Sequence, residues 1–300
     1  MGAGHSHGGS AAAGHKGRLQ LVLAITVTIL VAEVAGALLS GSLALLADAG
    51  HMLMDAGGIA LALLAIKFGQ RSPSQARTFG YLRLEILAAA FNALLLFAIG
   101  VFVIVEAVRR LISPPQVASG IMLTFGIVAL CGNACSLLLL RHGQGESLNI
   151  RGAFLEVLSD FLGAAAVIVA AVIITVTGFE RADPIASLVI GVLIIPRTWQ
   201  LLRQAGDVLL EATPKDVDLD DVRRHMLETS GVIDVHDLHA WTITSGVNVL
   251  SAHVVVSSSE LGGQVLDQLG GCLAEHFDIE HSTFQIEPPG HRDHEPILHR

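Results

Sequence analysis

Six long apolar segments dominate this chain of 300 residues. They run near residues 19–39, 44–66, 84–108, 118–140, 152–176 and 185–203, and turn-forming Gly, Ser and Pro residues separate them. A helix needs about 20 apolar residues to cross the hydrocarbon core of a bilayer. Charged residues make up only 15% of the chain, against about 25% in soluble domains. The sequence therefore predicts an α-helical membrane protein with six transmembrane helices in a lipid bilayer.

Basic residues at the segment ends predict the orientation, because Lys and Arg are enriched in cytosolic loops. A cytosolic N-terminus places the larger basic set inside, namely Lys16, Arg18, Lys67, Arg71, Arg77, Arg83, Arg141, Arg151, Arg197 and Arg203. The opposite side then holds Arg109, Arg110 and Arg181. We therefore expect both termini in the cytosol.

The chain changes character after the sixth segment. Charged residues become frequent from about residue 211, and apolar residues begin to alternate. The pattern predicts a helix from Asp218 to Thr229, strands at 232–244 and 247–256, a helix at 260–277 and a strand at 283–287. This αββαβ order indicates a small two-layer α+β domain of ferredoxin-like kind.

The predicted organisation has four parts. A flexible tail (1–17) precedes a six-helix transmembrane domain (18–205), a cytosolic domain (206–288) and a second flexible tail (289–300). The first tail carries His5, His7 and His15, and is interpreted either as a solvated end or as a weak metal-capturing segment. The net charge of −9 offers no basic stripe for phosphates, which argues against nucleic acid as a partner.

Two pairs of ionisable residues lie inside the apolar segments. His51 and Asp55 occur in the second segment, and Glu156 and Asp160 in the fifth, each pair spaced i,i+4. On a helix this spacing puts both side chains on one face. A charge at bilayer depth costs at least ~2.5 kcal/mol, so such residues need a compensating partner.

A divalent cation is the partner that these residues favour. Three carboxylates face one imidazole, and no intramembrane Lys or Arg is expected near them, so a cation is missing. The donor set suits Zn²⁺, Co²⁺, Cd²⁺ or Fe²⁺, with its excess of carboxylates tilting it toward Mn²⁺. Asp48, one turn before His51, is expected to orient a ligand, and its alternative role is that of an additional ligand. Glu33 in the first segment is interpreted as a packing contact between helices, with the lining of a cavity as its alternative role.

Histidines of the predicted α+β domain suggest a second metal site. His236 and His253 flank the predicted hairpin, and the third strand could bring His281 near them, with Glu287 at its end. Three histidines on neighbouring strands leave a metal site and a structural role equally open. His225 and His276 fall on predicted helices, and we interpret them as surface residues.

Several long motifs resemble the cation diffusion facilitators, closest to the zinc-transporter branch. They are LSGSLALLADAGH (39–51), RTFGYLRLEIL (77–87), ADP (182–184) and VHDLHAW (235–241). The resemblance covers roughly residues 15–288. The resemblance implies a homodimeric exporter of divalent metal driven by proton antiport. It also implies a transporter rather than an enzyme.

The resemblance also implies where metal binds. The central site of the family, built from the second and fifth spans, falls on His51, Asp55, Glu156 and Asp160. A cytosolic metal site falls on His236, His253, His281 and Glu287, in a domain that pairs across the dimer. The expected transported and regulatory metal is Zn²⁺, with Cd²⁺, Co²⁺, Fe²⁺ or Mn²⁺ also accepted.

The chain departs from the family in two places. Zinc-type members usually carry His at the position of Glu156, which puts a strict preference for zinc in doubt. The loop after the fourth span holds only His142, where many eukaryotic relatives are rich in His. The short loop and tails are typical of a bacterial inner-membrane exporter.

Two rival classes use the same residues differently. An integral-membrane metalloenzyme could activate metal-bound water, but the chain has no His-Glu-x-x-His motif. A membrane-anchored metal sensor would signal through the cytosolic domain, but an anchor needs no buried carboxylates. Metal flux into sealed proteoliposomes distinguishes these classes from an exporter.

Overall fold

The computed structural model describes residues 9–69, 71–141 and 148–291. The chain divides into two compact units, one made of Met1–Ala60 with Phe91–Gln200 and the other of Leu61–Ala90 with Leu201–Arg300. His5, His7 and His142 lie outside the described residues, as does most of the predicted C-terminal tail. The unit with the α+β domain also includes 61–90, which the sequence analysis assigned to the transmembrane domain.

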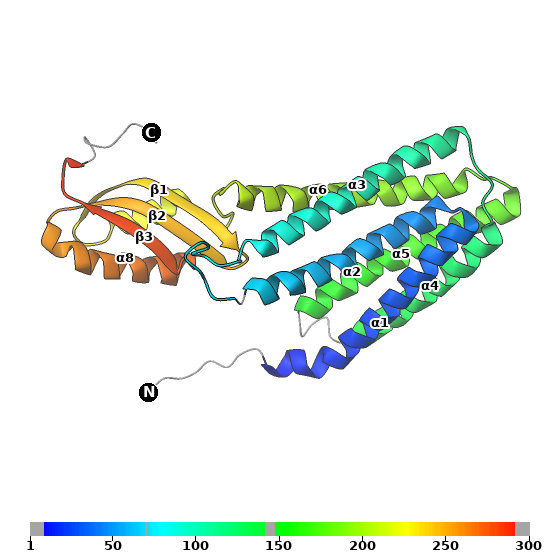
Figure 1. Cartoon of the computed structure of the whole chain (residues 1–300), viewed down its shortest axis with the longest axis horizontal. Coiled ribbons are helices and arrows are strands. Elements are labelled where there is room, and N and C mark those ends of the chain that lie inside the picture. The colour runs from blue at the N-terminus through cyan, green and yellow to red at the C-terminus, as the bar shows by residue number, and fades with distance from the viewer. Residues whose placement is uncertain (1–8, 70, 142–147, 292–300) are drawn as a thin grey trace. The chain divides into compact units, whose positions relative to one another are not determined.

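Each of the six apolar segments forms a helix (Figure 1). The helices are α1 (Gly9–Ser40), α2 (Leu43–Gly69), α3 (Leu84–Ile112), α4 (Ser119–Leu140), α5 (Leu148–Thr177) and α6 (Ala182–Leu209). Helix α1 begins at Gly9, inside the predicted tail, because Ala11–Ala13 are strong helix formers. His15 therefore belongs to a helix.

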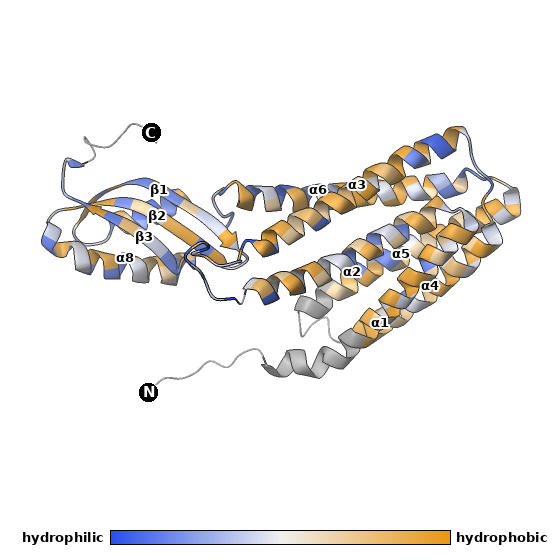
Figure 2. Ribbon diagram, in the orientation of Figure 1, coloured by the Kyte–Doolittle hydropathy of each residue, from blue (hydrophilic) through white to orange (hydrophobic). Residues whose placement is uncertain are grey.

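Hydrophobic residues predominate along these helices (Figure 2). Among the residues that the structure describes, five helices are long and apolar enough to cross a membrane, namely α1, α3, α4, α5 and α6. Helix α2 has 27 residues, a sufficient length, but Asp48, His51 and Asp55 interrupt its apolar sequence. The helical membrane fold is thus confirmed, and the sixth span stays a prediction.

Small residues let helices of the first unit approach one another closely. A Cβ atom added at Gly132 of α4 would lie 2.6 Å from Ile29 of α1, and one added at Gly100 of α3 would lie 2.9 Å from Ile195 of α6. Both distances are shorter than van der Waals contact, so a larger residue at either position would have to displace the isoleucine side chain. Close approach at small residues is how membrane helices gain packing energy in place of the hydrophobic effect.

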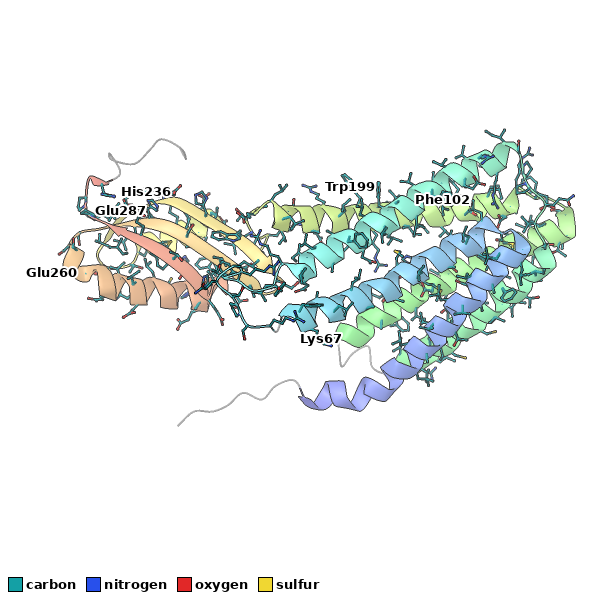
Figure 3. All side chains as sticks on the ribbon, viewed as in Figure 1. Lys67, Phe102, Trp199, His236, Glu260 and Glu287 are labelled. Atoms are coloured by element: carbon teal, nitrogen blue, oxygen red, sulfur yellow. The ribbon has the colours of Figure 1, made fainter. Side chains whose placement is uncertain are left out.

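The outside of the first unit carries large apolar side chains. Phe102 of α3 is 57% exposed and Trp199 of α6 is 56% exposed, and Figure 3 labels both positions. Large apolar patches are rare on soluble monomers, whereas lipid tails solvate such side chains well. The exposure therefore agrees with a bilayer around these helices.

Asp183, in the first turn of α6, caps the start of α2. Its carboxylate accepts hydrogen bonds from the Ser42 hydroxyl (2.5 Å) and from the backbone N–H groups of Leu43 (2.9 Å) and Ala44 (3.2 Å). The Asp183 side chain is fully buried, and Arg110 of α3 lies 4.0 Å away. An acceptor at a helix N-terminus satisfies otherwise unpaired N–H groups and complements the helix dipole. This contact fixes the start of the helix that carries His51 and Asp55.

The second unit contains the α+β domain. Its elements are α7 (Leu219–Leu227), β1 (Val232–Thr244), β2 (Val247–Val256), the 3₁₀-helix η1 (Ser259–Leu261), α8 (Gly262–Phe277) and β3 (His281–Glu287). The sheet order is β1-β2-β3, with β1 and β2 antiparallel and β2 and β3 parallel. The predicted αββαβ order is confirmed, although β3 begins two residues earlier than predicted.

Apolar residues between the sheet and its helices form the core of this domain. The buried residues are Val222 and Met226 of α7, Val235, Leu250 and Val254 of the sheet, and Val265, Leu269 and Leu273 of α8. The spacing of the α8 residues places them on one face of the helix, and this face packs on the sheet (Figure 1). The domain therefore has the two layers that the sequence predicts.

Glu85, in the first turn of α3, contacts the turn between β1 and β2. Its carboxylate accepts hydrogen bonds from the hydroxyls of Thr244 and Ser245, the latter at 2.8 Å. Arg83 pairs with Glu211 at 2.6 Å. These polar contacts join residues 83–85 to the C-terminal part of the second unit.

We expect Asp183→Ala to destabilise the protein by about 1–3 kcal/mol, because it leaves buried donors at the start of α2 without an acceptor. Thermal unfolding of the purified full-length protein in lipid nanodiscs measures the effect. Asp216→Ala, which removes an exposed carboxylate, is the matched control and should leave the melting temperature unchanged. Equal melting temperatures for the two variants would contradict the capping role.

Candidate metal sites

Three of the four ionisable residues predicted in the helices come together in the first unit. One ligand atom each from His51 and Asp55 of α2 and Asp160 of α5 lies within 4.8 Å of the others. The His51 Nε2 atom is 3.3 Å from an Asp55 carboxylate oxygen. The i,i+4 spacing places His51 and Asp55 on one face of α2, and the packing of the helices adds Asp160 from α5. All three side chains are largely buried.

Glu156 lines the same cavity one turn before Asp160. The cavity has a volume of about 240 Å³ and is lined mostly by apolar residues, with Asp55, Glu156 and Asp160 as its acidic groups. Glu156 is close enough to Asp55 to interact with it directly. The cavity is thus large enough for a metal ion with water, and its acidic groups all come from α2 and α5.

A second acidic pair lies beside this cavity, and the sequence analysis did not find it. Glu33 of α1 is fully buried, and Asp48 of α2 is 2% exposed. Both Glu33 carboxylate oxygens and one of Asp48 lack a hydrogen-bond donor among the described residues. The two carboxyls interact with each other, so Glu33 makes a polar contact between α1 and α2. Buried carboxyls without donors require protons or a cation.

Helix α5 approaches Asp48 closely at Gly163. A Cβ atom added at Gly163 would lie 2.7 Å from the Asp48 carboxylate. No larger residue fits there without moving the carboxylate. The glycine therefore positions Asp48 between α2 and α5, one turn from His51.

The expectation that no basic residue is near these carboxylates is wrong. Arg197 of α6 is close enough to Asp55, Glu156 and Asp160 to interact with each electrostatically. The sequence assigned Arg197 to the cytosolic end of a span, without information on which helix it faces. One guanidinium still leaves the three carboxylates with an excess of negative charge, so a cation remains favoured.

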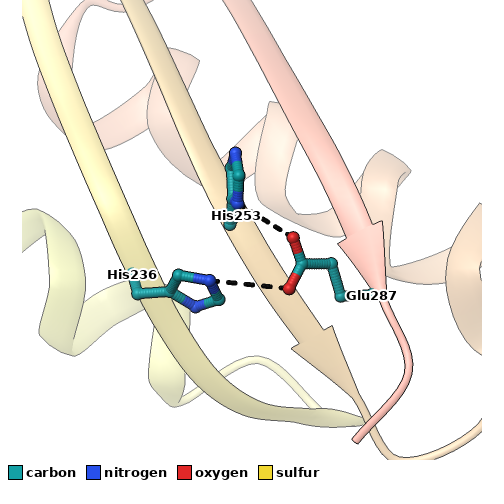
Figure 4. A group of neighbouring side chains, drawn as sticks. All are labelled: His236, His253 and Glu287. Atoms are coloured by element: carbon teal, nitrogen blue, oxygen red, sulfur yellow. Dashed lines mark ion pairs between the residues drawn. The ribbon is translucent and has the colours of Figure 1, made fainter. Parts of the chain in front are cut away.

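In the second unit, His236, His253 and Glu287 form a compact group (Figure 4). The His253 Nδ1 atom is 2.8 Å from Glu287, and the His236 Nε2 atom is 3.5 Å from the other oxygen of the same carboxylate. One ligand atom from each residue lies within 4.8 Å of the others. Figure 3 shows His236 and Glu287 side by side in the sheet. Two imidazoles and one carboxylate form a ligand set that zinc uses often.

The register of the sheet explains the grouping. His236 on β1 pairs directly with His253 on β2. On β3, Gln285 pairs with His253, and Glu287 follows two residues later on the same face. Each residue of the group therefore comes from a different strand.

The structure does not bring His281 to this group. His281 pairs with Val249, four residues away from His253 along β2, and its ring packs edge-on against Phe79 at 5.4 Å. Four strand residues separate the two histidines by roughly 13 Å. His281 is the first residue of β3 and Glu287 the last, so the two residues lie at opposite ends of the strand.

Asp237 belongs to the neighbourhood of the site, although the sequence analysis did not single it out. Its carboxylate lies 3.7 Å from His253 and 3.0 Å from His239. Its φ of 49° falls in the left-handed region, where β1 is irregular between His236 and His239. Asp tolerates this conformation better than most residues. The irregularity turns the Asp237 carboxylate toward His253, where it can orient the imidazole.

Comparison with protein families gives two matches. Residues 19–210 match the cation efflux transmembrane domain, and residues 214–289 match the cytoplasmic domain of cation efflux proteins. Together the matches include both candidate sites.

Similar proteins occur in several bacteria. The chain is 47% identical to the metal cation efflux system protein CzcD of Cupriavidus metallidurans, over 96% of this chain and 90% of that protein. It is 41% identical to the zinc transporter ZitB of Escherichia coli, over 90% and 87%. It is 38% identical to the cadmium, cobalt and zinc/H(+)-K(+) antiporter of Bacillus subtilis, over 98% and 95%.

A solved structure is also similar to part of the chain. The metal-bound C-terminal domain of the CzcD transporter from Cupriavidus metallidurans is 44% identical, with a TM-score of 0.23, and the match covers 24% of this chain and 99% of that one.

An α-helical membrane domain with buried carboxylates, joined to an α+β domain, defines a membrane transporter for cations rather than an enzyme. The chain belongs to the cation diffusion facilitator family and is a cation efflux protein.

Proposed function

We propose that this protein exports divalent metal ions of the Zn²⁺ class from the cytosol in exchange for protons. One observation supports this more than any other. His51, Asp55 and Asp160 place ligand atoms within 4.8 Å of one another inside an apolar helical unit, and Glu156 lines the same cavity. We infer that all four bind the transported ion.

The choice of ion follows from the ligands and the relatives. One imidazole with carboxylates accepts Zn²⁺, Co²⁺ and Cd²⁺, and additional hard oxygen donors extend the range toward Mn²⁺ and Fe²⁺. Similar proteins are named for zinc, cadmium and cobalt. Zn²⁺ is the ion that we propose as principal substrate, with a range broadened by Glu156.

Proton exchange follows from competition at the ligands. A protonated carboxyl group or imidazole does not coordinate metal, so protons and metal ions bind the same atoms in turn. The cavity takes metal from the cytosol and releases protons, and incoming protons on the opposite side displace the metal. The Bacillus subtilis relative is named as an antiporter that uses H(+), which supports this coupling. Asp48 and Glu33 are further buried carboxyls that protons can occupy beside the site.

The location and orientation follow from the sequence. The basic residues at the ends of the helices favour cytosolic termini, and the C-terminal residues match a cytoplasmic domain. We therefore propose a multi-pass protein of a bacterial inner membrane.

The α+β domain is proposed as a regulatory metal-binding and dimerisation domain. His236, His253 and Glu287 come from three different strands, so a metal ion bound to them would tie the strands together. We propose Zn²⁺ as the ligand and a homodimer as the functional assembly. Along the chain, the group follows the helices that carry the transport site. Its proposed role is therefore regulation rather than passage of the ion.

We expect Asp55→Ala and Asp160→Ala each to reduce Zn²⁺ and Co²⁺ transport to the background of protein-free liposomes, because each removes a ligand. Stopped-flow flux into proteoliposomes with an imposed pH gradient measures the effect. Ser159→Ala, an exposed neighbour of Asp160, serves as control and should transport normally. Full transport by the Asp160→Ala protein would refute the site.

Glu156→His should narrow the ion range toward Zn²⁺, because it replaces a hard oxygen donor with a borderline nitrogen donor. The helix keeps its spacing, so we expect the melting temperature to stay unchanged. The measurement compares the flux of Zn²⁺, Co²⁺, Cd²⁺, Fe²⁺ and Mn²⁺ through the parent protein and the Glu156→His variant. The same ranking of ions before and after the change would mean that Glu156 does not set selectivity.

In the cytosolic domain, His236→Ala combined with His253→Ala should remove one Zn²⁺ per chain from the full-length protein, because two of three ligands are lost. Equilibrium dialysis in the Asp160→Ala background isolates this binding from the transport site. His239→Ala, three residues from His236 but outside the group, is the control. Unchanged stoichiometry in the double variant would show that the cytosolic metal binds elsewhere.

A further inference from the structure

A short basic segment joins α2 to α3. Residues 71–83, which we call the basic loop, contain Arg71, Arg77 and Arg83 and no Asp or Glu. Lys67 adds a further positive charge in the last turn of α2. The whole chain has a net charge of −9, so this segment departs from the rest. Residues 71–79 are all exposed, and the basic loop therefore presents positive charge on an accessible surface.

Backbone contacts give the basic loop a defined shape. Ser74 and Arg77 exchange both of their backbone N–H···O hydrogen bonds, each at 3.0 Å, and the Gly80 N–H donates to the Arg77 carbonyl at 2.9 Å. Gly80 has a φ of 64°, a conformation that suits glycine. The Phe79 ring packs edge-on against His281 at the start of β3. The exposed arginines are thus presented by a fixed backbone.

Two aromatic rings support the guanidinium groups of this loop. Arg71 lies over the Phe68 ring, 4.4 Å from its centroid, and Arg77 lies over the Tyr81 ring at 4.6 Å. The two rings are 6.4 Å apart, so both guanidinium groups belong to one cluster. Arg77 also donates one hydrogen bond to the Tyr81 hydroxyl at 2.5 Å. A guanidinium stacked on a ring keeps the N–H groups of its edge for other acceptors.

The chain supplies few carboxylates for these charges. Arg83 pairs with Glu211 at 2.6 Å. Among the residues that the structure describes, Lys67, Arg71 and Arg77 form no ion pair. Guanidinium groups bind phosphate oxygens through two parallel N–H···O bonds. The basic loop therefore has donors for a phosphate group that comes from outside the chain.

The position of the loop in the chain indicates the source of that phosphate. Helix α3, which is long and apolar enough to cross a membrane, begins at Leu84, directly after the loop. Residues 71–83 are therefore expected at the level of the lipid headgroups, where Tyr is enriched. Basic segments beside a span attract anionic phospholipids. Positive charge alone would suffice to orient the span, whereas guanidinium groups held on rings are suited to binding a headgroup.

We propose that the basic loop binds the phosphate headgroup of an anionic phospholipid, with Arg71 and Arg77 as hydrogen-bond donors and Lys67 as an additional positive charge. A bound headgroup would anchor the junction of α2 and α3 at the membrane surface, and α2 is the helix that carries His51 and Asp55. The competing role of these residues is to set the orientation of the spans without binding a particular lipid.

Native mass spectrometry of the detergent-purified full-length protein tests the proposal, because it counts bound lipid molecules. The probes are phosphatidylglycerol, which is anionic, and phosphatidylcholine with the same acyl chains, which has no net charge. Each basic residue beside an anionic headgroup contributes roughly a fivefold factor in affinity, so Arg71→Gln combined with Arg77→Gln should weaken the binding of the first phosphatidylglycerol about 25-fold. Lys215→Gln, which removes an exposed charge outside the loop, is the control and should bind phosphatidylglycerol normally.

Both arginines are exposed, so the substitutions leave core packing intact, and phosphatidylcholine should bind all variants equally. Equal affinity for phosphatidylglycerol in the double variant and its parent would overturn the proposal, as would equal affinity of the parent for the two lipids. Displacement of the bound lipid by an equal concentration of inorganic phosphate would show a site for free phosphate instead. Arg71→Lys combined with Arg77→Lys should restore only part of the affinity, and full restoration would contradict the role of the stacked guanidinium groups. The experiment measures no transport, so its failure leaves the proposed export function untouched.

Discussion

Burial of carboxylates among apolar helices is the constraint on which the rest of this structure depends. Glu33, Asp48 and Asp160 are almost completely buried, and Asp55 and Glu156 line an apolar cavity. Transfer of a charge from water into such surroundings costs several kcal/mol unless protons, an opposite charge or a metal compensates it. Arg197 supplies one opposite charge, and the remainder must come from ions that enter and leave. A site that is unfavourable when empty and charged is well suited to exchange protons for metal.

The site needs a rigid frame, and the contacts at one end of α2 supply it. Asp183 fixes the first turn of α2, and Arg110 of α3 donates hydrogen bonds to Glu106 (3.0 Å) and to the Gly41 carbonyl (2.7 Å). Three helices thereby meet at the start of α2. Its His51 and Asp55 follow two to three turns further along, where Gly163 allows α5 to approach. Close packing at small residues thus brings together ligands that lie about a hundred residues apart in the chain.

The cytosolic domain obtains its ligands by a different route. Strand pairing places His236 beside His253, and the parallel third strand adds Glu287 from the same face. The helical layer places His225 beside His276 in the same domain.

The sequence by itself determined the helices, the order of the α+β domain and the pairs His51–Asp55 and Glu156–Asp160. Apolar length and i,i+4 spacing are local properties, which hold whatever the helix packs against. Only the tertiary structure decided that Glu33 meets Asp48, that Arg197 acts on the acidic residues, and that His281 lies away from His253. Tertiary structure also decided that Asp237 lies beside His253 and that the rings of His225 and His276 are in contact. These relations depend on helix rotation and strand register, which follow from packing of the whole core rather than from any local pattern.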